Sequence, residues 1–215
     1  MDLTWYGLGC FRLTERDFPS IVMDPYDPEV VGRKLRPLRA EIVTSSRLIE
    51  EPWEAEWPQV RGGSRTLAGP GEYEIGGVFV TGVASARSRK RDAAGGDNII
   101  YSVGYDGVVV CHLGELGRTL TQAQAEAIGR VTVLLIPIGI PGGLTPAMAA
   151  ETVSLVEPDI VIPMQTKLPG LTVDRKPVDG FLKEMGITEP EVLTTLKVSA
   201  GDSPEETQII LLEPQ

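Results

Sequence analysis

The pattern of apolar residues changes near the midpoint of the chain, and this change limits the folds that the chain can adopt. Up to residue 112, short apolar runs are separated by Gly, Pro and polar turns, a pattern typical of antiparallel strands. Beyond residue 120, apolar runs alternate with segments of helical character. This order indicates a layered α/β fold with two sheets and with helices on the outside. No linker divides the halves, so we expect one domain over residues 1–215.

The first half is expected to consist mainly of strands and turns. We predict short strands over residues 3–6, 10–13, 21–23 and 41–43, and hairpins that pair 73–75 with 78–81 and 98–103 with 108–112. The sequence Gly7-Leu8-Gly9 predicts a tight turn. A weak helix is expected over 30–35, an irregular loop over 51–58 and a mobile polar loop over 85–97.

The second half is expected to contain helices between buried strands. Continuous apolar runs predict buried strands over 133–137 and 159–163. We predict helices over 121–128, with Thr121 as N-cap, over 145–156, and over 177–185 with Gly186 at its end. The tail, residues 192–212, alternates like one or two strands.

Composition narrows the classes of partner. The formal net charge of −10 makes nucleic acid and anionic membranes poor partners. No apolar run approaches the roughly 20 residues that cross a bilayer. Because Asp2 and strand-like sequence follow the first residue, we expect no signal peptide. The two cysteines, Cys10 and Cys111, imply no disulfide framework and are expected to be buried thiols. Together these features predict a cytoplasmic protein. The oligomeric state is left open, with a homo-oligomer as one alternative.

Two basic clusters run against the acidic composition. The first contains Arg33, Lys34, Arg36 and Arg39, and is expected to be a solvated surface because charge clusters are usually exposed. The second begins at Arg87 and continues through residues 89–91.

A strand end at residues 42–50 is the candidate functional stretch. Ile42-Val43 is apolar, and the short polar residues Thr44-Ser45-Ser46 follow it, as where a strand runs into a loop. Such strand ends commonly carry the chemistry of mixed α/β folds.

Several stretches, in a constant order along nearly the whole chain, resemble the metallo-β-lactamase-fold hydrolases, especially the bacterial branch related to L-ascorbate-6-phosphate lactonase. The stretches are Leu3-Thr4-Trp5-Tyr6-Gly7, Cys10-Phe11-Arg12, Met23-Asp24-Pro25-Tyr26, Gly69-Pro70-Gly71-Glu72-Tyr73-Glu74, Asp97-Asn98-Ile99-Ile100-Tyr101, Cys111-His112-Leu113-Gly114-Glu115-Leu116-Gly117, Leu135-Ile136-Pro137-Ile138-Gly139, Glu157-Pro158 and Val161-Ile162-Pro163-Met164-Gln165. The resemblance implies a four-layer αββα sandwich with a metal cleft at the sheet edges.

The resemblance also assigns the family's zinc-ligand positions. The loop that reads Thr-His-x-His-x-Asp-His in the family places Ser45, Arg47, Ile49 and Glu50 at its ligand positions. The later ligand positions fall on Arg87, Glu115 and Gln165, and the leading Gly-His pair is Gly7-Leu8 here. The single histidine, His112, matches a position that is not usually a ligand.

These replacements predict a site without zinc. A catalytic zinc ion takes three or more protein N, S or O ligands, and Arg and Ile offer none. Glu50, Glu115 and Asp24 carry oxygens that Mg²⁺ or Ca²⁺ accepts, but Arg47 and Arg87 would place cations in the same space. We therefore expect no cofactor, although zinc is usual in the family.

Two interpretations of the cleft stay open. In the first, Arg47 and Arg87 pair with Glu50 and Glu115 and fill the cleft as an ion-pair network. In the second, a guanidinium is left to bind a small anion such as phosphate or a carboxylate.

Other motifs have weaker functional interpretations. A triad of His112 with Ser45 or Ser46 and Glu115 can be drawn, but a hydrogen-bonded structural histidine is favoured. The loop 139–143 lacks the lysine and spacing of a P-loop. Trp53 and Trp57 are candidates for a partner surface or for a cover over the cleft.

The sequence therefore predicts a metallo-β-lactamase-fold protein that has lost its zinc ligands and acts by binding or assembly, not by catalysis. The alternative is a hydrolase, either metal-dependent through an unusual carboxylate site or metal-free, that acts on a small anionic ester or lactone.

Overall fold

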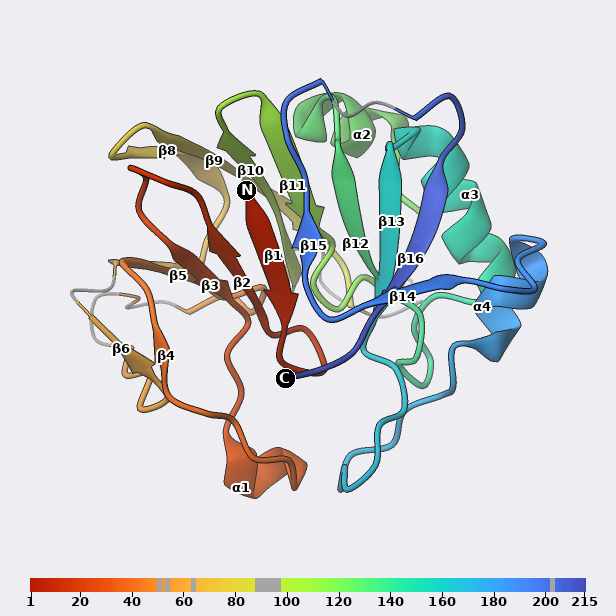
Figure 1. Cartoon of the computed structure of the whole chain (residues 1–215), viewed down its shortest axis with the longest axis horizontal. Helices are drawn as coiled ribbons and strands as arrows, with labels where there is room; N and C mark the ends of the chain where they lie inside the picture. The colour runs from red at the N-terminus through yellow and green to blue at the C-terminus, as the bar shows by residue number, and fades with distance from the viewer. Residues whose placement is uncertain (50–51, 53–54, 63–64, 88–97, 202–203) are drawn as a thin grey trace.

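Two β-sheets packed face to face form the centre of the molecule (Figure 1). The computed structural model describes residues 1–49, 52, 55–62, 65–87, 98–201 and 204–215. Within these ranges, one sheet has six strands, the other has eight, and a two-stranded sheet packs on the outer face of the six-stranded sheet.

The six-stranded sheet is built mostly from the start of the chain. Its strands, in spatial order, are β15 (Leu196–Lys197), β1 (Asp2–Trp5), β2 (Phe11–Thr14), β3 (Ile21–Met23), β5 (Ile42–Thr44) and β7 (Arg65–Leu67). The pairs from β15 to β3 are antiparallel, whereas β3, β5 and β7 run parallel.

The eight-stranded sheet joins an antiparallel part to a parallel part. Its strands, in spatial order, are β14 (Glu191–Leu193), β16 (Gln208–Leu212), β13 (Ile160–Met164), β12 (Val133–Pro137), β11 (Val108–His112), β10 (Asn98–Tyr105), β9 (Val78–Ser85) and β8 (Gly71–Ile75). The strands from β11 to β14 run parallel, which agrees with their continuous apolar sequences.

Helices cover the outer face of the eight-stranded sheet (Figure 1). They are α2 (Gln122–Ile128), α3 (Pro146–Val156) and α4 (Asp179–Glu184). Thr121 caps α2 in a capping box with Gln124, as expected from the sequence. Helix α4 begins two residues later than expected, because Val178 takes the N-cap position.

Alternation along the strands divides the apolar residues between two layers. On β10, Ile99 and Tyr101 face the space between the sheets, whereas Ile100 faces the helices. Strand β12 repeats the pattern: Leu135 faces the space between the sheets, and Leu134 faces the helices. Cys10 and Cys111 are fully buried, as expected, and burial raises the pKa of both thiols.

The outer face of the six-stranded sheet has a different cover. The small sheet of β4 (Leu38–Arg39) and β6 (Val60–Arg61) packs there with half-buried Tyr26 and Trp57. The prediction of a helix over 30–35 is wrong in its bounds: α1 spans Pro28–Val31, and Gly32 ends it in the left-handed conformation. In the described part of the chain, this layer is therefore a small sheet with loops instead of long helices.

The predicted strands and hairpins of the first half are confirmed, with boundaries that differ by up to two residues, except that β9 extends four residues beyond the predicted end. The short strands β4, β6 and β7 were not predicted. The turn at Gly7–Gly9 is closed by a hydrogen bond from Cys10 N to Gly7 O of 2.9 Å. Most of the predicted loop over 85–97, and part of that over 51–58, lie outside the described residues. No helix in the described ranges is long and apolar enough to span a membrane.

Candidate functional site

The carboxyl ends of four strands meet at one edge of the two sheets and carry the candidate residues. Asp24 follows β3, Ser45 follows β5, and Gln165 follows β13. Glu115 comes three residues after β11 ends at His112. Because β3 and β5 are parallel, as are β11, β12 and β13, these ends lie together.

The backbone is held in an uncommon conformation where it lines this edge. Leu8, Asp24 and Gln165 have φ of 50°, 43° and 58°, in the left-handed region that L-residues rarely adopt. A hydrogen bond of 3.1 Å from Gln165 N to Leu8 O joins the two sheets at this point. Such conformations cluster where the surrounding structure fixes a site.

His112 is a fully buried residue whose two ring nitrogens are both engaged by the backbone. Its Nδ1 accepts a hydrogen bond of 3.0 Å from Gly114 N, so the proton lies on Nε2, which donates to Gly9 O at 2.9 Å. Ser46 Oγ is 3.4 Å from the same Nδ1. Because Nδ1 already accepts from the backbone, the imidazole is not placed to activate a serine, and the structural interpretation of His112 is favoured.

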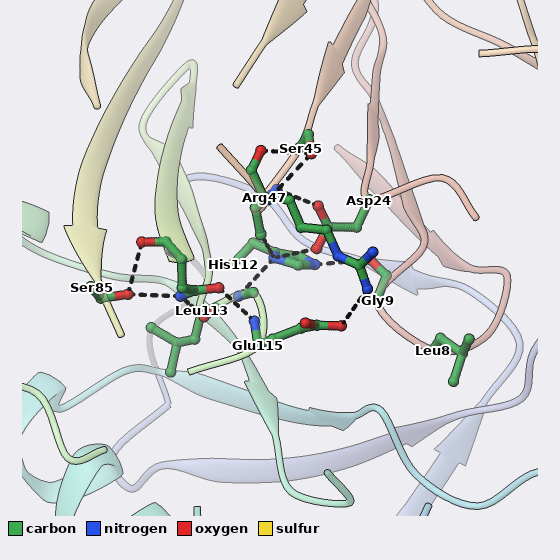
Figure 2. A network of polar contacts seen from close by, with 12 residues as sticks. Leu8, Gly9, Asp24, Ser45, Arg47, Ser85, His112, Leu113 and Glu115 are labelled. Atoms are coloured by element: carbon green, nitrogen blue, oxygen red, sulfur yellow. Dashed lines mark hydrogen bonds and ion pairs between the residues drawn. The ribbon is translucent and has the colours of Figure 1, made fainter. Parts of the chain in front are cut away.

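Asp24 lies beside this histidine in the same corner (Figure 2). Its Oδ1 accepts a hydrogen bond of 2.6 Å from Ser46 N, and its Oδ2 is 3.9 Å from His112 Nδ1. Burial raises the pKa of the Asp24 carboxyl, and the neighbouring Glu115 acts in the same direction.

Asn98 fixes the backbone that carries Glu115. Its side-chain amide donates to Ser85 Oγ at 2.7 Å and to Leu113 O at 3.0 Å, and its oxygen accepts from Glu115 N at 2.8 Å. Gly114 has φ of +63°, and a Cβ built there would lie 2.4 Å from Asn98 Oδ1. A side chain at position 114 would therefore disrupt the turn that presents Glu115.

Glu115 pairs with two arginines, whose side chains reach it from different elements. Arg47 Nη2 lies 3.4 Å from Glu115 Oε1, and Arg87 forms an ion pair with Oε2 (Arg47 is shown in Figure 2). The Glu115 side chain is only 12% exposed, whereas that of Arg47 is 68% exposed. The predicted pairing thus occurs on Glu115, while Glu50, the other predicted partner, lies outside the described residues.

A third guanidinium, which the sequence analysis missed, belongs to Arg175. Its Nε donates to Gln165 Oε1 at 3.0 Å, and its Nη1 donates to the backbone oxygen of Asp174 at 2.8 Å. Burial lowers the pKa of Arg175. The negative charge of Glu115 acts in the opposite direction, and the positive charge of Arg47 adds to the lowering. The sequence signal that could have indicated Arg175 is the long loop after β13, because long loops at a site are often functional.

A cavity of about 480 Å³ opens at this edge of the sheets. Its polar lining includes Asp24, Ser45, Arg47, Glu115, Gln165 and Arg175. Leu8, at the expected position of the family's leading histidine, and half-buried Trp57 are part of its apolar lining. Trp57 therefore helps to enclose the cavity, whereas Trp53 lies outside the described residues.

The donor set at this edge does not suit a zinc ion. Ser45 Oγ hydrogen-bonds the backbone of Arg47, Gln165 Oε1 accepts from Arg175, and Glu115 is held between two guanidiniums. Zinc binding would need imidazoles, thiolates or unpaired carboxylates instead. Within the ranges that the structure describes, no group of three or more His, Cys, Asp and Glu side chains could hold a metal ion.

Comparison with known proteins gives the chain's relatives. A family profile described as the beta-lactamase superfamily domain matches residues 2–165. A protein of Methanopyrus kandleri, named as a metal-dependent hydrolase of UPF0173, is 28% identical over 87% of this chain and 94% of its own.

Solved structures agree with this match. A Thermotoga maritima protein, titled as a candidate zinc-dependent hydrolase of the metallo-β-lactamase superfamily, is 33% identical with a TM-score of 0.79, over 100% of this chain and 99% of its own. The YhfI protein of Bacillus subtilis, titled as a metallo-β-lactamase fold protein, shares the fold at 8% identity and a TM-score of 0.60, over 99% of this chain and 96% of its own.

The expected fold class is confirmed by these matches, while the branch related to L-ascorbate-6-phosphate lactonase stays a prediction. The profile match extends from β1 to Gln165, and the ends of β5, β11 and β13 carry Ser45, Glu115 and Gln165, which the resemblance assigned. The chain therefore belongs to the metallo-β-lactamase superfamily.

Proposed function

We propose that this protein is a non-catalytic, metal-independent member of its superfamily, whose cleft binds a ligand and does not hydrolyse it. The single observation that carries the proposal is the pairing of Glu115 with both Arg47 and Arg87. A carboxylate shared by two guanidiniums is a poor ligand for a divalent ion, because the ion would be repelled by both cations.

Further support comes from the neutral groups around Glu115. His112 is a buried imidazole with both nitrogens bonded to the backbone, so it is not available as a ligand or as a general base. Gln165 holds Arg175 through its amide oxygen. His112 and Gln165 therefore stabilise the protein's own structure, and we propose that the cavity beside them binds a ligand.

The proposal is tested by measuring metal content and metal-induced stabilisation together. The purified protein is incubated with Zn²⁺, Mn²⁺ or Mg²⁺, desalted and analysed for metal, and its thermal midpoint is recorded with each ion. We expect far less than one metal per chain and no rise in the midpoint, since a ligand that binds the folded state stabilises it. One tightly held metal per chain, with a matching stabilisation, would contradict the proposal.

A second candidate function is hydrolysis of a small anionic ester or lactone. It is favoured by the names of the relatives, since the Methanopyrus kandleri and Thermotoga maritima proteins are both described as hydrolases. Turnover of phosphate monoesters, phosphodiesters or lactones by the purified chain would favour it, provided that Glu115→Gln abolishes the activity. Activity that survives Glu115→Gln would come from a contaminant or from another site.

A further inference from the structure

Arg175 differs from the other two cleft arginines in its partners. Arg47 and Arg87 pair with the Glu115 carboxylate, whereas the hydrogen bonds of Arg175 go to an amide oxygen and a backbone oxygen. Across the described residues, no carboxylate lies within ion-pair distance of Arg175. Its guanidinium is nevertheless half-buried. A partly desolvated cation without an anionic partner favours an added negative charge.

Most charged side chains of the cavity are engaged within the protein. The cavity is lined by the guanidiniums of Arg47 and Arg175 and by the carboxyl groups of Asp24, Asp27 and Glu115, and Arg87 pairs with Glu115. Burial and Glu115 both raise the pKa of the Asp24 carboxyl, which disfavours its negative charge. Glu115 pairs with two arginines, and Asp27 accepts a hydrogen bond from Glu29 N at the start of α1. Among the described lining residues, Arg175 is therefore the cation that forms no ion pair of its own.

Apolar side chains line the mouth of the same cavity. Val30 and Leu48 are 66% and 55% exposed, and they are two of the four large apolar side chains that the described surface exposes. Both line the cavity together with Leu8, Val173 and the ring of Trp57. Exposed apolar side chains gathered at one cavity mark a binding surface.

Together, these features define a ligand with two parts. A guanidinium fork suits the oxygens of a carboxylate or a phosphate. The apolar mouth suits a hydrocarbon or aromatic group, and a volume of about 480 Å³ lies in the range of small-molecule sites.

We propose that the cleft binds an organic anion, in which a carboxylate or phosphate head lies against Arg175 and Arg47 and an apolar body lies against Leu48, Val30 and Trp57. This inference rests on the proposed non-catalytic function, because it requires the cleft to hold an anion in place of a metal. Neither Arg175 nor the apolar mouth was indicated by the sequence.

Calorimetric titration with four probes separates the two parts of the ligand. Phenyl phosphate and benzoate carry both parts, inorganic phosphate carries only the charge, and phenol carries only the ring. We expect phenyl phosphate or benzoate to bind at least about tenfold more tightly than either inorganic phosphate or phenol, since both parts contribute. Equal affinity for phenyl phosphate and inorganic phosphate, or tightest binding of phenol, would overturn the proposal.

Four variants assign the parts to residues. Arg175→Gln is expected to weaken binding of phenyl phosphate by about tenfold or more, through loss of a charge-assisted contact. Glu115→Gln is expected to strengthen it, because the competing carboxylate is removed. Leu48→Ser should weaken phenyl phosphate but leave inorganic phosphate unchanged. Arg36→Ala, an exposed arginine outside the cleft, is the matched control and should change nothing.

The outcomes distinguish this inference from the proposed function. If Arg175→Gln fails to fold, Arg47→Ala supplies the same test, since its side chain is exposed. A metal-free wild-type protein that binds none of the anions defeats this inference alone. A stoichiometric metal ion in the cleft defeats the proposed function. Binding that is insensitive to Arg175→Gln and Arg47→Ala but lost in Arg36→Ala would place the anion elsewhere.

Discussion

The cleft has an inner and an outer region that are held together in different ways. In the inner region, His112, Asn98 and Ser46 are buried, and their hydrogen bonds go largely to backbone groups. In the outer region, Arg47 and Arg87 meet Glu115 through charged, partly exposed side chains. Buried neutral bonds fix a shape, whereas exposed ion pairs contribute little to stability and can exchange partners.

This difference separates the scaffold from the binding surface. The inner region preserves the strand ends and turns that the fold needs at this edge, including the turn at Gly114. The outer region decides what enters the cavity. Substitutions in the two regions should therefore affect different measurements, stability in the first case and ligand affinity in the second.

The largest effect is expected from His112→Ala. The substitution leaves Gly114 N–H and Gly9 C=O without their partner in a fully buried position and opens a cavity. The free energy of unfolding should fall by about 3 kcal/mol, as for other buried groups that lose both packing and hydrogen bonds. Urea denaturation followed by circular dichroism measures this change.

A matched variant separates volume from hydrogen bonding. His112→Phe restores a ring but no acceptor for Gly114 N–H, so it should recover only part of the loss. If either variant loses less than about 1 kcal/mol, the inner region does not fix the shape as described.

A smaller, pH-dependent effect is expected from Asp24→Asn. The raised pKa means that the folded protein binds more protons at Asp24 than the unfolded chain does, between the ordinary pKa of about 3.9 and the raised value. Wild-type stability should therefore fall relative to Asp24→Asn as the pH rises through this window, with the full loss present above the raised pKa. The asparagine can still accept from Ser46 N.

Unfolding measured from pH 3 to 8 on both proteins gives this difference. Titrating groups that do not interact with Asp24 contribute equally in both chains, so the difference reports on Asp24 and on its neighbours His112 and Glu115. A difference that stays constant with pH, or that favours the wild type as the pH rises, would show that burial does not control this carboxyl.

The smallest effect on stability is expected from Arg47→Ala. Its side chain is 68% exposed, and exposed ion pairs are worth little, so the free energy of unfolding should change by less than about 0.5 kcal/mol. Anion binding, in contrast, should weaken. A loss of several kcal/mol would assign Arg47 to the scaffold and remove the distinction between the two regions.

The fold could be predicted well because its signals are local. Alternating and continuous apolar runs placed the longer strands, and Thr121 marked the start of α2. The short strands β4, β6 and β7 were missed, and the tail forms three strands where one or two were expected. The helix expected over 30–35 lies instead at Pro28–Val31, because Asp27 caps its start and Gly32 adopts φ of +74° directly after Val31.

The candidate site could be predicted only in part, because its residues come from loops whose paths depend on the whole fold. The resemblance placed Arg47, Arg87 and Glu115 at one edge, and the structure pairs them. Arg175 lies in a loop that matches no family motif, and long-range hydrogen bonds return it to the cleft, among them Lys176 N to Gly139 O and Arg175 Nε to Gln165 Oε1. Such long-range contacts leave no pattern in a single sequence.

The central claim is that guanidinium groups have replaced the metal in this cleft. Crystals grown or soaked with zinc chloride, with anomalous diffraction recorded on both sides of the zinc absorption edge, test it most directly. The account predicts no zinc peak within bonding distance of Glu115, Asp24 or Gln165, and arginine side chains in well-defined density around Glu115. A fully occupied zinc ion bonded to these side chains would contradict it.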